Sequence, residues 1–311
     1  MRLLLLGANG QVGHALRPAL VRLGEVVCTT RSGLLPEGTA CERADFDQPG
    51  TLPALVARIA PDVVVNAAAY TAVDRAEQEP DAAFRANAEA PGALAAACAR
   101  SGALLVHYST DYVFDGSADR PWREDDRTAP LGVYGASKLA GEQAVRGSGA
   151  RHMVFRTAWV YGAHGHNFMR TMLRLAAERD ELRVVDDQHG TPTTAGLIAS
   201  VTATVLASGV QPSGLWHLTA SGGTTWHGFA SAIVASAHAR GLLRTMPRVT
   251  PVPSSEYPTP ARRCYPVETR LPRSRPAIHV RTAHLGTKEV LPGGRPHECA
   301  PRNPRPSLPF A

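Results

Sequence analysis

Residues Gly7-Ala-Asn-Gly-Gln-Val-Gly13 follow the apolar run Leu3-Leu-Leu-Leu6 near the start of the chain. An apolar run that ends in glycine is typical of a buried strand, and the residues after it predict a helix over 11–23. Glycine at positions 7, 10 and 13 permits a tight turn, close approach of the backbone to a pyrophosphate, and close packing of helix on strand. The stretch therefore predicts a dinucleotide-binding turn. Its Gly-x-x-Gly-x-x-Gly spacing departs from the plain Gly-x-Gly-x-x-Gly fingerprint, and a glycine turn without a ligand is the alternative.

Strand and helix signals alternate beyond this turn. Short apolar segments stand at 26–29, 63–66, 104–109 and 152–157, and alanine-rich helical segments lie between them at 52–59, 81–101 and 137–145. Such a series predicts an α/β fold with a doubly wound parallel sheet of Rossmann type, covered by helices on both faces. After residue 160 the pattern loosens into a helix at 168–179, a loop at 186–194, a helix at 195–207 and a strand near 215–219.

This pattern predicts three parts of the chain. We expect an NAD(P)-binding Rossmann domain over residues 1–160, with a contribution from 190–220. Residues 161–189 and 221–263 are expected to form a smaller C-terminal substrate-binding domain. Residues 264–311 contain nine of the 25 prolines and no apolar period, which is typical of a poorly ordered tail.

Charge and composition exclude several classes of protein. Of the net charge of +6 on the 311 residues, residues 264–311 hold +5, so residues 1–263 hold only about +1. A nucleic-acid-binding patch is therefore not expected in the folded part. No run approaches the ~20 apolar residues of a membrane helix, so we expect a cytoplasmic protein. The five cysteines are scattered without metal-ligand spacing, and neither disulfides nor a metal site is predicted.

Tyr134 and Lys138 stand four residues apart in Val133-Tyr-Gly-Ala-Ser-Lys-Leu139. On a helix this spacing puts a phenol and an ammonium on one face. A tyrosine by itself has a pKa near ~10, and a neighbouring cation lowers that pKa and suits the phenol to acid–base work. The pair predicts a proton-transfer device, with an ordinary surface pair as the alternative.

Residues at the ends of the predicted strands are candidates for cofactor contacts. The second strand ends in Thr29-Thr-Arg-Ser32, where an acidic residue would hold the ribose of NAD. Arg31 can instead pair with the 2′-phosphate of NADPH, although a solvated loop arginine is the alternative. Asp45 and Phe46 can flank an adenine, and Ala67-Ala-Ala-Tyr70 offers small side chains where a cofactor passes closely.

Longer motifs follow one another collinearly to about residue 263. They include Asn66-Ala-Ala-Ala-Tyr-Thr-Ala-Val-Asp74, His107-Tyr-Ser-Thr-Asp-Tyr-Val-Phe-Asp-Gly116, Tyr134-Gly-Ala-Ser-Lys138, Phe155-Arg-Thr-Ala-Trp-Val-Tyr161 and Asp187-Gln-His-Gly-Thr-Pro-Thr193. This set resembles the extended short-chain dehydrogenases/reductases, and among these the dTDP-4-dehydrorhamnose reductase family. The resemblance implies an NAD(P)H-dependent oxidoreductase that reduces the C4 keto group of dTDP-4-dehydro-β-L-rhamnose. A dTDP-sugar is then the small-molecule partner, and a homodimer is compatible with the resemblance.

The resemblance also implies roles for single residues. Tyr134 would protonate the C4 oxygen, Lys138 would lower the pKa of Tyr134 and hold the nicotinamide ribose, and Thr110 would hydrogen-bond the same oxygen. Asp111 would contact the substrate, Trp159 would wall the sugar or serve as a core aromatic, and Asn87 would be structural. NADPH is the expected cofactor, with NADH as the alternative. The turn, the strand ends and the resemblance together give the cofactor-binding set Gly7, Gly10, Gln11, Val12, Gly13, Arg31, Asp45, Phe46, Ala68, Ala69, Tyr70, Thr71, Tyr108, Tyr134 and Lys138.

Other activities of the same superfamily fit these residues less well than the reductase does. Nucleotide-sugar dehydratases place an Asp-Glu pair after the corresponding threonine, whereas this chain has Asp111-Tyr112. An epimerase reading lacks the other ordered matches. A noncatalytic NADP-binding regulatory subunit would be free to lose Tyr134 or Lys138, and this chain retains both.

The sequence departs from the family pattern after Arg263. A shifted reading frame and a divergent terminus both account for the Pro- and Arg-rich residues that follow. We expect this tail not to form the family's closing helices, and to be cut readily by protease while residues 1–263 survive.

Overall fold

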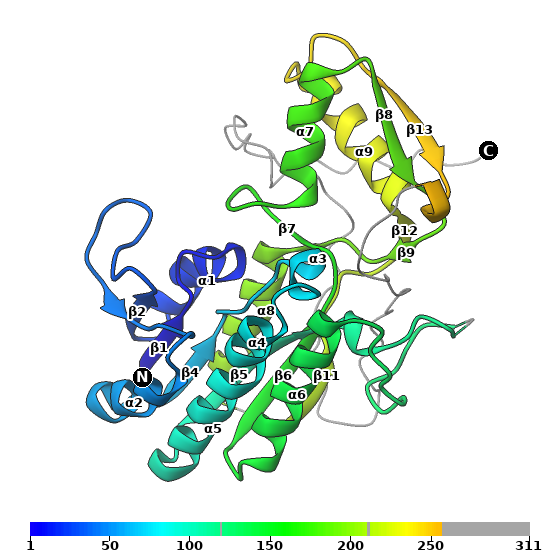
Figure 1. Cartoon of the computed structure of the whole chain (residues 1–311). Helices are drawn as coiled ribbons and strands as arrows, with labels where there is room; N and C mark the ends of the chain where they lie inside the picture. Colours follow the sequence, from blue (N-terminus) through cyan, green and yellow to red (C-terminus); the bar gives the residue numbers. More distant parts are fainter. Residues whose placement is uncertain (119, 210–211, 257–311) are drawn as a thin grey trace, which may run out of the picture.

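A seven-stranded parallel sheet forms the centre of the computed structural model, which describes residues 1–118, 120–209 and 212–256 (Figure 1). From one edge to the other, the strands are β11 (Gly214–His217), β6 (His152–Thr157), β5 (Leu104–Thr110), β4 (Val63–Asn66), β1 (Arg2–Leu6), β2 (Glu25–Thr30) and β3 (Glu42–Arg43). The chain starts in the middle at β1, builds outward to β3, and then returns to β4 to build the other half. This order confirms the predicted doubly wound α/β fold.

Helices cover both faces of the sheet, and this explains why its strands are apolar on both sides. On one face lie α1 (Gln11–Val21) and α8 (Ala195–Ala207), and on the other lie α2 (Leu52–Ile59), α5 (Ala90–Ser101) and α6 (Val133–Gly147). The leucines of β1 alternate between the two resulting cores. Leu3 and Leu5 pack on the α1 side, Leu4 and Leu6 pack on the α2 side, and all four are fully buried.

A second, smaller group of elements is visible at the top of Figure 1. It contains α7 (Phe168–Glu178), β8 (Glu181–Val185), α9 (Trp226–Ala239) and β13 (Arg248–Val252). Strands β8 and β13 pair in parallel, and the helices pack on them around a separate core that includes Met172, Val184 and Ile233. Two short strand pairs lie at the junction with the sheet: β7 (Val160–Tyr161) with β10 (Thr193–Thr194), and β9 (His189–Gly190) with β12 (Thr224–Thr225).

The continuous helix predicted over 81–101 is interrupted in the structure. It consists of α4 (Pro80–Phe84), a π-helical stretch (Arg85–Glu89) and α5. Pro91 has no N–H to donate to the carbonyl of Asn87, which breaks the α-helical hydrogen-bond pattern. The freed Asn87 backbone lies tightly against α6, because a Cβ on Gly141 would lie 2.0 Å from its oxygen.

Several elements were not indicated by the sequence pattern. These are β7, β8, β12, α9 and β13, together with β9 and β10 inside the predicted loop 186–194. The remaining connections are α3 (Val73–Ala76) and 3₁₀ turns at Pro49–Thr51, Asp111–Val113 and Ser254–Glu256. The expectations for residues 264–311 lie outside the described residues.

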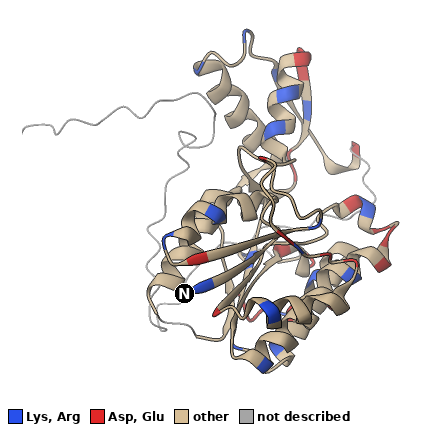
Figure 2. Ribbon diagram, turned by 90° about the vertical axis from the view of Figure 1, so that its left-hand side faces the viewer, with Lys and Arg blue, Asp and Glu red and all other residues tan. Residues whose placement is uncertain are grey.

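Acidic and basic residues are interspersed along the helices and loops of the described part, as the red and blue stretches of the ribbon in Figure 2 show. In residues 1–118, 120–209 and 212–256, no helix combines the length and the apolar character that are needed to cross a membrane.

Candidate active site

The glycine turn lies between β1 and α1. Gly7 has a φ of +76°, a conformation that favours glycine, and a Cβ placed on it would lie 2.7 Å from the amide nitrogen of Ala68. A Cβ on Gly13 would lie 2.0 Å from the carbonyl oxygen of Gly7. Gly10 precedes α1, and its N–H donates to that same oxygen over 2.9 Å. The turn therefore has no space for larger side chains and presents the amino end of α1 at the carboxyl edge of the sheet.

The first two residues of α1 have different surroundings. Val12 is partly buried against the core on the α1 side. The side-chain amide of Gln11 donates to the carbonyl oxygen of His166 over 3.1 Å and accepts from Nδ2 of Asn167 over 2.9 Å. The turn is thereby joined to the loop that leads into α7.

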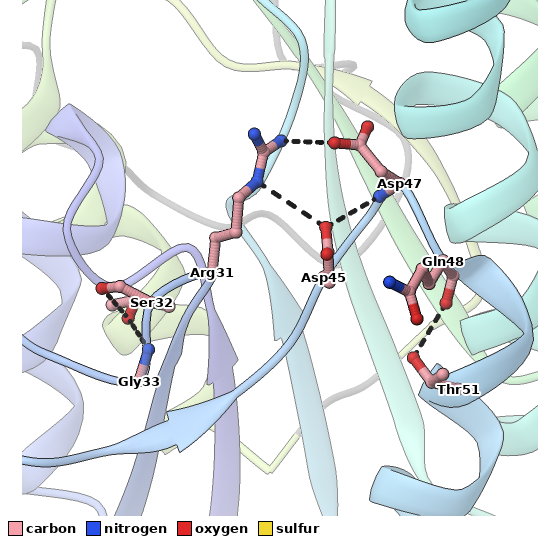
Figure 3. A network of polar contacts seen from close by, with 8 residues as sticks. Arg31, Ser32, Gly33, Asp45, Asp47, Gln48 and Thr51 are labelled. Atoms are coloured by element: carbon pink, nitrogen blue, oxygen red, sulfur yellow. Dashed lines mark hydrogen bonds and ion pairs between the residues drawn. The ribbon is translucent and has the colours of Figure 1, made fainter.

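Arg31 lies directly after β2 and faces Asp45 and Asp47 from the segment after β3 (Figure 3). Its Nε is 3.7 Å from a carboxylate oxygen of Asp45, and a terminal nitrogen is 3.4 Å from one of Asp47. Phe46, between the two acids, is buried in the core on the α2 side. Arg31 and Asp45, which were each predicted to contact the cofactor, therefore lie close together, whereas Asp47 was not identified from the sequence.

The segment after β4 contains the predicted small residues. The N–H of Ala68 donates to Oδ1 of Asn66 over 3.1 Å, and Ala69 and Thr71 are exposed. Asn87 accepts from the N–H of Tyr70 over 2.9 Å and donates to its carbonyl oxygen over 3.0 Å. The buried amide of Asn87 thus fixes the backbone of this segment, which is a structural role.

Tyr108 connects the sheet to α6 through its backbone. Its ring is buried in the core on the α1 side, where the hydroxyl shares a 2.8 Å hydrogen bond with Thr202 of α8. Its carbonyl oxygen accepts a 2.7 Å hydrogen bond from Nζ of Lys138 on the opposite face. Because the ring lies on the α1 side, only the main chain of Tyr108 is available for contacts on the α6 side of the sheet.

Thr110 and Asp111 lie at the carboxyl end of β5. The Thr110 hydroxyl donates to Oδ1 of Asp111 over 3.0 Å and accepts from the N–H of Tyr112 over 3.2 Å. Asp111 is only 2% exposed, and this burial raises the pKa of its carboxyl to about 7 against the opposing effect of its hydrogen bonds. The carboxyl group can therefore change protonation state near neutral pH.

Tyr134 and Lys138 lie on one face of α6 beside the end of β5. Burial, followed by the Asp111 carboxylate, raises the pKa of Tyr134 to about 12, and a hydrogen bond with Thr110 acts in the opposite direction. Burial lowers the pKa of Lys138 to about 8, against the nearby charge of Glu142. Lys138 is not among the groups that shift the pKa of Tyr134 here, and its ammonium donates to the Tyr108 carbonyl oxygen. Its expected lowering of the Tyr134 pKa stays a prediction.

Trp159 lies at the junction between the sheet and the second group of elements. Its φ of +45° is uncommon for a residue with a large side chain. The indole stacks on Trp226 with ring centroids 3.5 Å apart, and a Cβ on Gly190 would lie 2.1 Å from it. The ring also packs against the core of the second group, which is the core role considered from the sequence, and its role as a wall beside the sugar stays a prediction.

A buried ion pair behind α6 was missed by the sequence analysis. Nε and a terminal nitrogen of Arg156 lie 2.9 and 2.7 Å from the two carboxylate oxygens of Glu142, and both side chains are almost fully buried. The Arg156 guanidinium also lies 5.0 Å from the ring centroid of Phe114. Glu142 follows Lys138 at the same four-residue spacing that separates Tyr134 from Lys138, which places it on the same face of the helix, but nothing local in the sequence indicates Arg156 as its partner.

A cavity of about 790 Å³ runs along α1, and its lining includes Gln11, His14, Arg17, Glu37 and His164. Tyr134, Lys138 and Thr110 do not line it, so it does not mark the acid–base group. In the part of the chain that the structure describes, no three His, Cys, Asp or Glu side chains are placed to hold a metal ion.

The strand order, the glycine turn and the Tyr134/Lys138 pair at the carboxyl edge define an extended short-chain dehydrogenase/reductase. The chain matches the family described as the RmlD substrate binding domain over residues 1–280, and it belongs to that family. The match extends beyond Arg263, the residue after which the sequence departs from the family pattern.

Individual relatives agree with this assignment. The chain is 51% identical to dTDP-4-dehydrorhamnose reductase of Burkholderia thailandensis over 272 residues, which cover 85% of this chain and 88% of the relative. The solved structure of dTDP-4-dehydrorhamnose reductase from Bacillus anthracis in complex with NADP is 33% identical, with a TM-score of 0.77 and coverage of 86% of this chain and 90% of that chain. A Clostridium acetobutylicum ortholog is 37% identical, with a TM-score of 0.77 and coverage of 87% and 90%.

Proposed function

We propose that this protein reduces the C4 keto group of dTDP-4-dehydro-β-L-rhamnose to give dTDP-β-L-rhamnose. NADPH is the preferred donor and NADH is also accepted. The observation that carries the proposal is the group formed by Tyr134, Lys138, Thr110 and Asp111 at the carboxyl edge of a sheet with a dinucleotide-type turn. The names of relatives that are 45–51% identical support the reaction, and the NADP complex of the Bacillus anthracis protein supports the cofactor.

The glycine turn fits a dinucleotide. Gly7 and Gly13 let the turn pack tightly against the Ala67–Ala68 backbone and the start of α1, and the N–H groups and the helix dipole at that helix end favour a pyrophosphate. Gly10, Gln11 and Val12 would hold the phosphates there, and Arg31 would pair with a 2′-phosphate. Ala68, Ala69, Tyr70 and Thr71 would line the passage beside the turn.

The chemistry that the bound nicotinamide supplies is a hydride for the C4 carbon. Tyr134 donates a proton to the oxygen that becomes the C4 hydroxyl, and the Thr110 hydroxyl holds that oxygen in place. Lys138, fixed by the Tyr108 carbonyl, provides a positive charge beside the phenol and holds the nicotinamide ribose. Asp111 contacts the sugar, and Trp159 gives it an apolar wall.

The reaction is tested with the purified full chain, dTDP-4-dehydrorhamnose and each cofactor in turn. We expect loss of nicotinamide absorbance that depends on both the sugar and the protein, and formation of dTDP-rhamnose. A folded protein that binds NADPH but oxidises neither cofactor would instead be a noncatalytic binding subunit. Alternative 4-keto sugars and nucleotide bases in the same assay would define the substrate.

The proposal includes a cytoplasmic location and a homodimer. Sedimentation of the full chain with and without NADPH measures its mass directly. A mass of twice 33.0 kDa is expected for the homodimer.

A further inference from the structure

The guanidinium of Arg31 lies between two carboxylates at the end of β2 (Figure 3). In folds of this type, the end of the second strand is where an acidic residue holds the adenosine ribose of NAD or an arginine holds the 2′-phosphate of NADP. This site has both an arginine and acidic residues, and the Arg31 guanidinium forms ion pairs with the carboxylates of Asp45 and Asp47. The inference that follows rests on the proposed function, because it concerns how the same site distinguishes NADPH from NADH.

The backbone places this group beside the glycine turn. The N–H of Ala8 donates to the carbonyl oxygen of Thr29 over 3.0 Å, which joins the turn to the end of β2. The N–H of Ala44 donates to the carbonyl oxygen of Thr30 over 2.9 Å, which joins the acidic segment to the same strand. A dinucleotide held at the turn therefore brings its ribose toward Arg31 and the two acids together.

The two acids are not equivalent. One carboxylate oxygen of Asp45 accepts a 3.1 Å hydrogen bond from the N–H of Asp47, and its side chain is 17% exposed. The Asp47 side chain is 43% exposed and approaches the guanidinium more closely, at 3.4 Å against 3.7 Å. Asp45 is thus fixed by its own segment, whereas Asp47 is the more exposed acid on the guanidinium.

The charges favour the two cofactors in different ways. A phosphate monoester carries about −1.5 to −2 charges at neutral pH, so a 2′-phosphate on Arg31 would meet the like charge of Asp47. The 2′-hydroxyl of NADH has no such charge and can donate a hydrogen bond to a carboxylate. We propose that Asp47 is a specificity-determining residue that competes with the 2′-phosphate of NADPH for Arg31 and thereby narrows the preference for NADPH over NADH.

The experiment measures binding of NADPH and of NADH to the full chain by calorimetry at low salt, in the absence of sugar. Asp47→Asn should raise the ratio of NADPH affinity to NADH affinity by about fivefold, the effect of one exposed like charge at about 4 Å. Glu42→Gln is the matched control. It removes one carboxylate from the neighbouring strand β3, but one that pairs with Arg58. The control should change the ratio by less than about twofold.

Two further measurements test the part played by Arg31. Arg31→Ala should weaken NADPH binding more than NADH binding, and adding Asp47→Asn to that variant should raise NADPH affinity by less than the fivefold seen with Arg31 present, because the 2′-phosphate is then no longer held beside Asp47. The fivefold gain of the single Asp47→Asn variant should also shrink at about 0.5 M salt, because exposed charges are then screened.

Each outcome separates this inference from the proposed reaction. If both dinucleotides bind and Asp47→Asn leaves the affinity ratio within twofold of the parent, the inference is wrong and the reductase proposal stands. If the ratio rises but no sugar is reduced, the inference stands and the reaction is wrong. If neither dinucleotide binds to any variant, both are wrong.

Discussion

Lys138 donates a 2.7 Å hydrogen bond to the carbonyl oxygen of Tyr108, and this contact joins α6 to the middle of the sheet. The Tyr108 ring is held on the far side of β5 by Thr202, so the carbonyl that receives the ammonium is itself fixed. The position of the ammonium is therefore determined by both faces of the sheet. Its charge is determined by burial, which lowers the pKa of Lys138 to about 8.

The first prediction concerns the pH dependence that follows. Lys138 is charged below its pKa and neutral above it, so kcat/KM for NADPH should fall as the pH rises above about 8. Values of kcat/KM measured between about pH 6 and 10 would show this decrease as the basic limb of the pH profile. Lys138→Arg keeps a charge throughout this range, and its profile should lack the limb even if its activity is lower. A wild-type profile that stays flat to pH 10 would contradict the assignment.

Tyr134→Phe should lower kcat by a factor on the order of 10²–10⁴ because it removes the donated proton. The dissociation constant for NADPH should change little, since the ring and its edge-on contact with Tyr112 remain. Lys138→Ala should instead weaken both turnover and NADPH binding. Steady-state rates and calorimetry on the same preparations distinguish the two patterns. Parent-like turnover of Tyr134→Phe would show that another group supplies the proton.

The sheet could be predicted from the sequence because its strands are short apolar runs with clear boundaries. Strand β4 and helices α2 and α8 have the predicted bounds, because turns and breaks in the apolar pattern mark their ends. The second group was harder to predict. Strand β8 has only five residues and alternates exposed and buried positions over the first four of them, and its partner β13 comes more than 60 residues later in the chain.

The parts of the candidate site that could be predicted are those where the local sequence itself requires a particular residue type. Glycine in the turn and the Tyr134/Lys138 spacing are examples. Contacts between distant segments could not be predicted in the same way. Asp47 meets Arg31 only because β3 pairs beside β2, and Arg156 meets Glu142 only because α6 packs on β6. These pairs depend on tertiary packing, which no local spacing records.

A further prediction uses the buried carboxyl of Asp111. Its pKa is raised to about 7 from an unfolded value near 3.9, so the folded state binds the proton more tightly. The resulting stability is fully present below about pH 4 and is lost as the pH rises to about 7. Asp111→Asn should remove this dependence. The unfolding free energies of the two proteins would be measured in urea at several pH values. If the free energies of parent and variant change with pH in the same way, the raised pKa is contradicted.

Gly13→Ala should disrupt the turn, because the added Cβ would lie 2.0 Å from the carbonyl oxygen of Gly7 and backbone cannot yield as a side chain can. We expect loss of NADPH binding and a lower melting temperature. Gly50→Ala is the matched control, since no atom lies within 4 Å of its added Cβ. If calorimetry shows the two variants binding NADPH alike, the turn is not the dinucleotide site.

The last prediction concerns the buried pair of Arg156 and Glu142. Glu142→Gln leaves the Arg156 guanidinium buried without its carboxylate, which costs about 3–5 kcal/mol of unfolding free energy in such pairs. The double variant Glu142→Gln with Arg156→Met removes both charges at similar volume and should recover most of that loss. Equilibrium unfolding in urea gives all three values. A single variant as stable as the parent, or a double variant no more stable than the single one, would show that the charge pairing is not what holds α6 on β6.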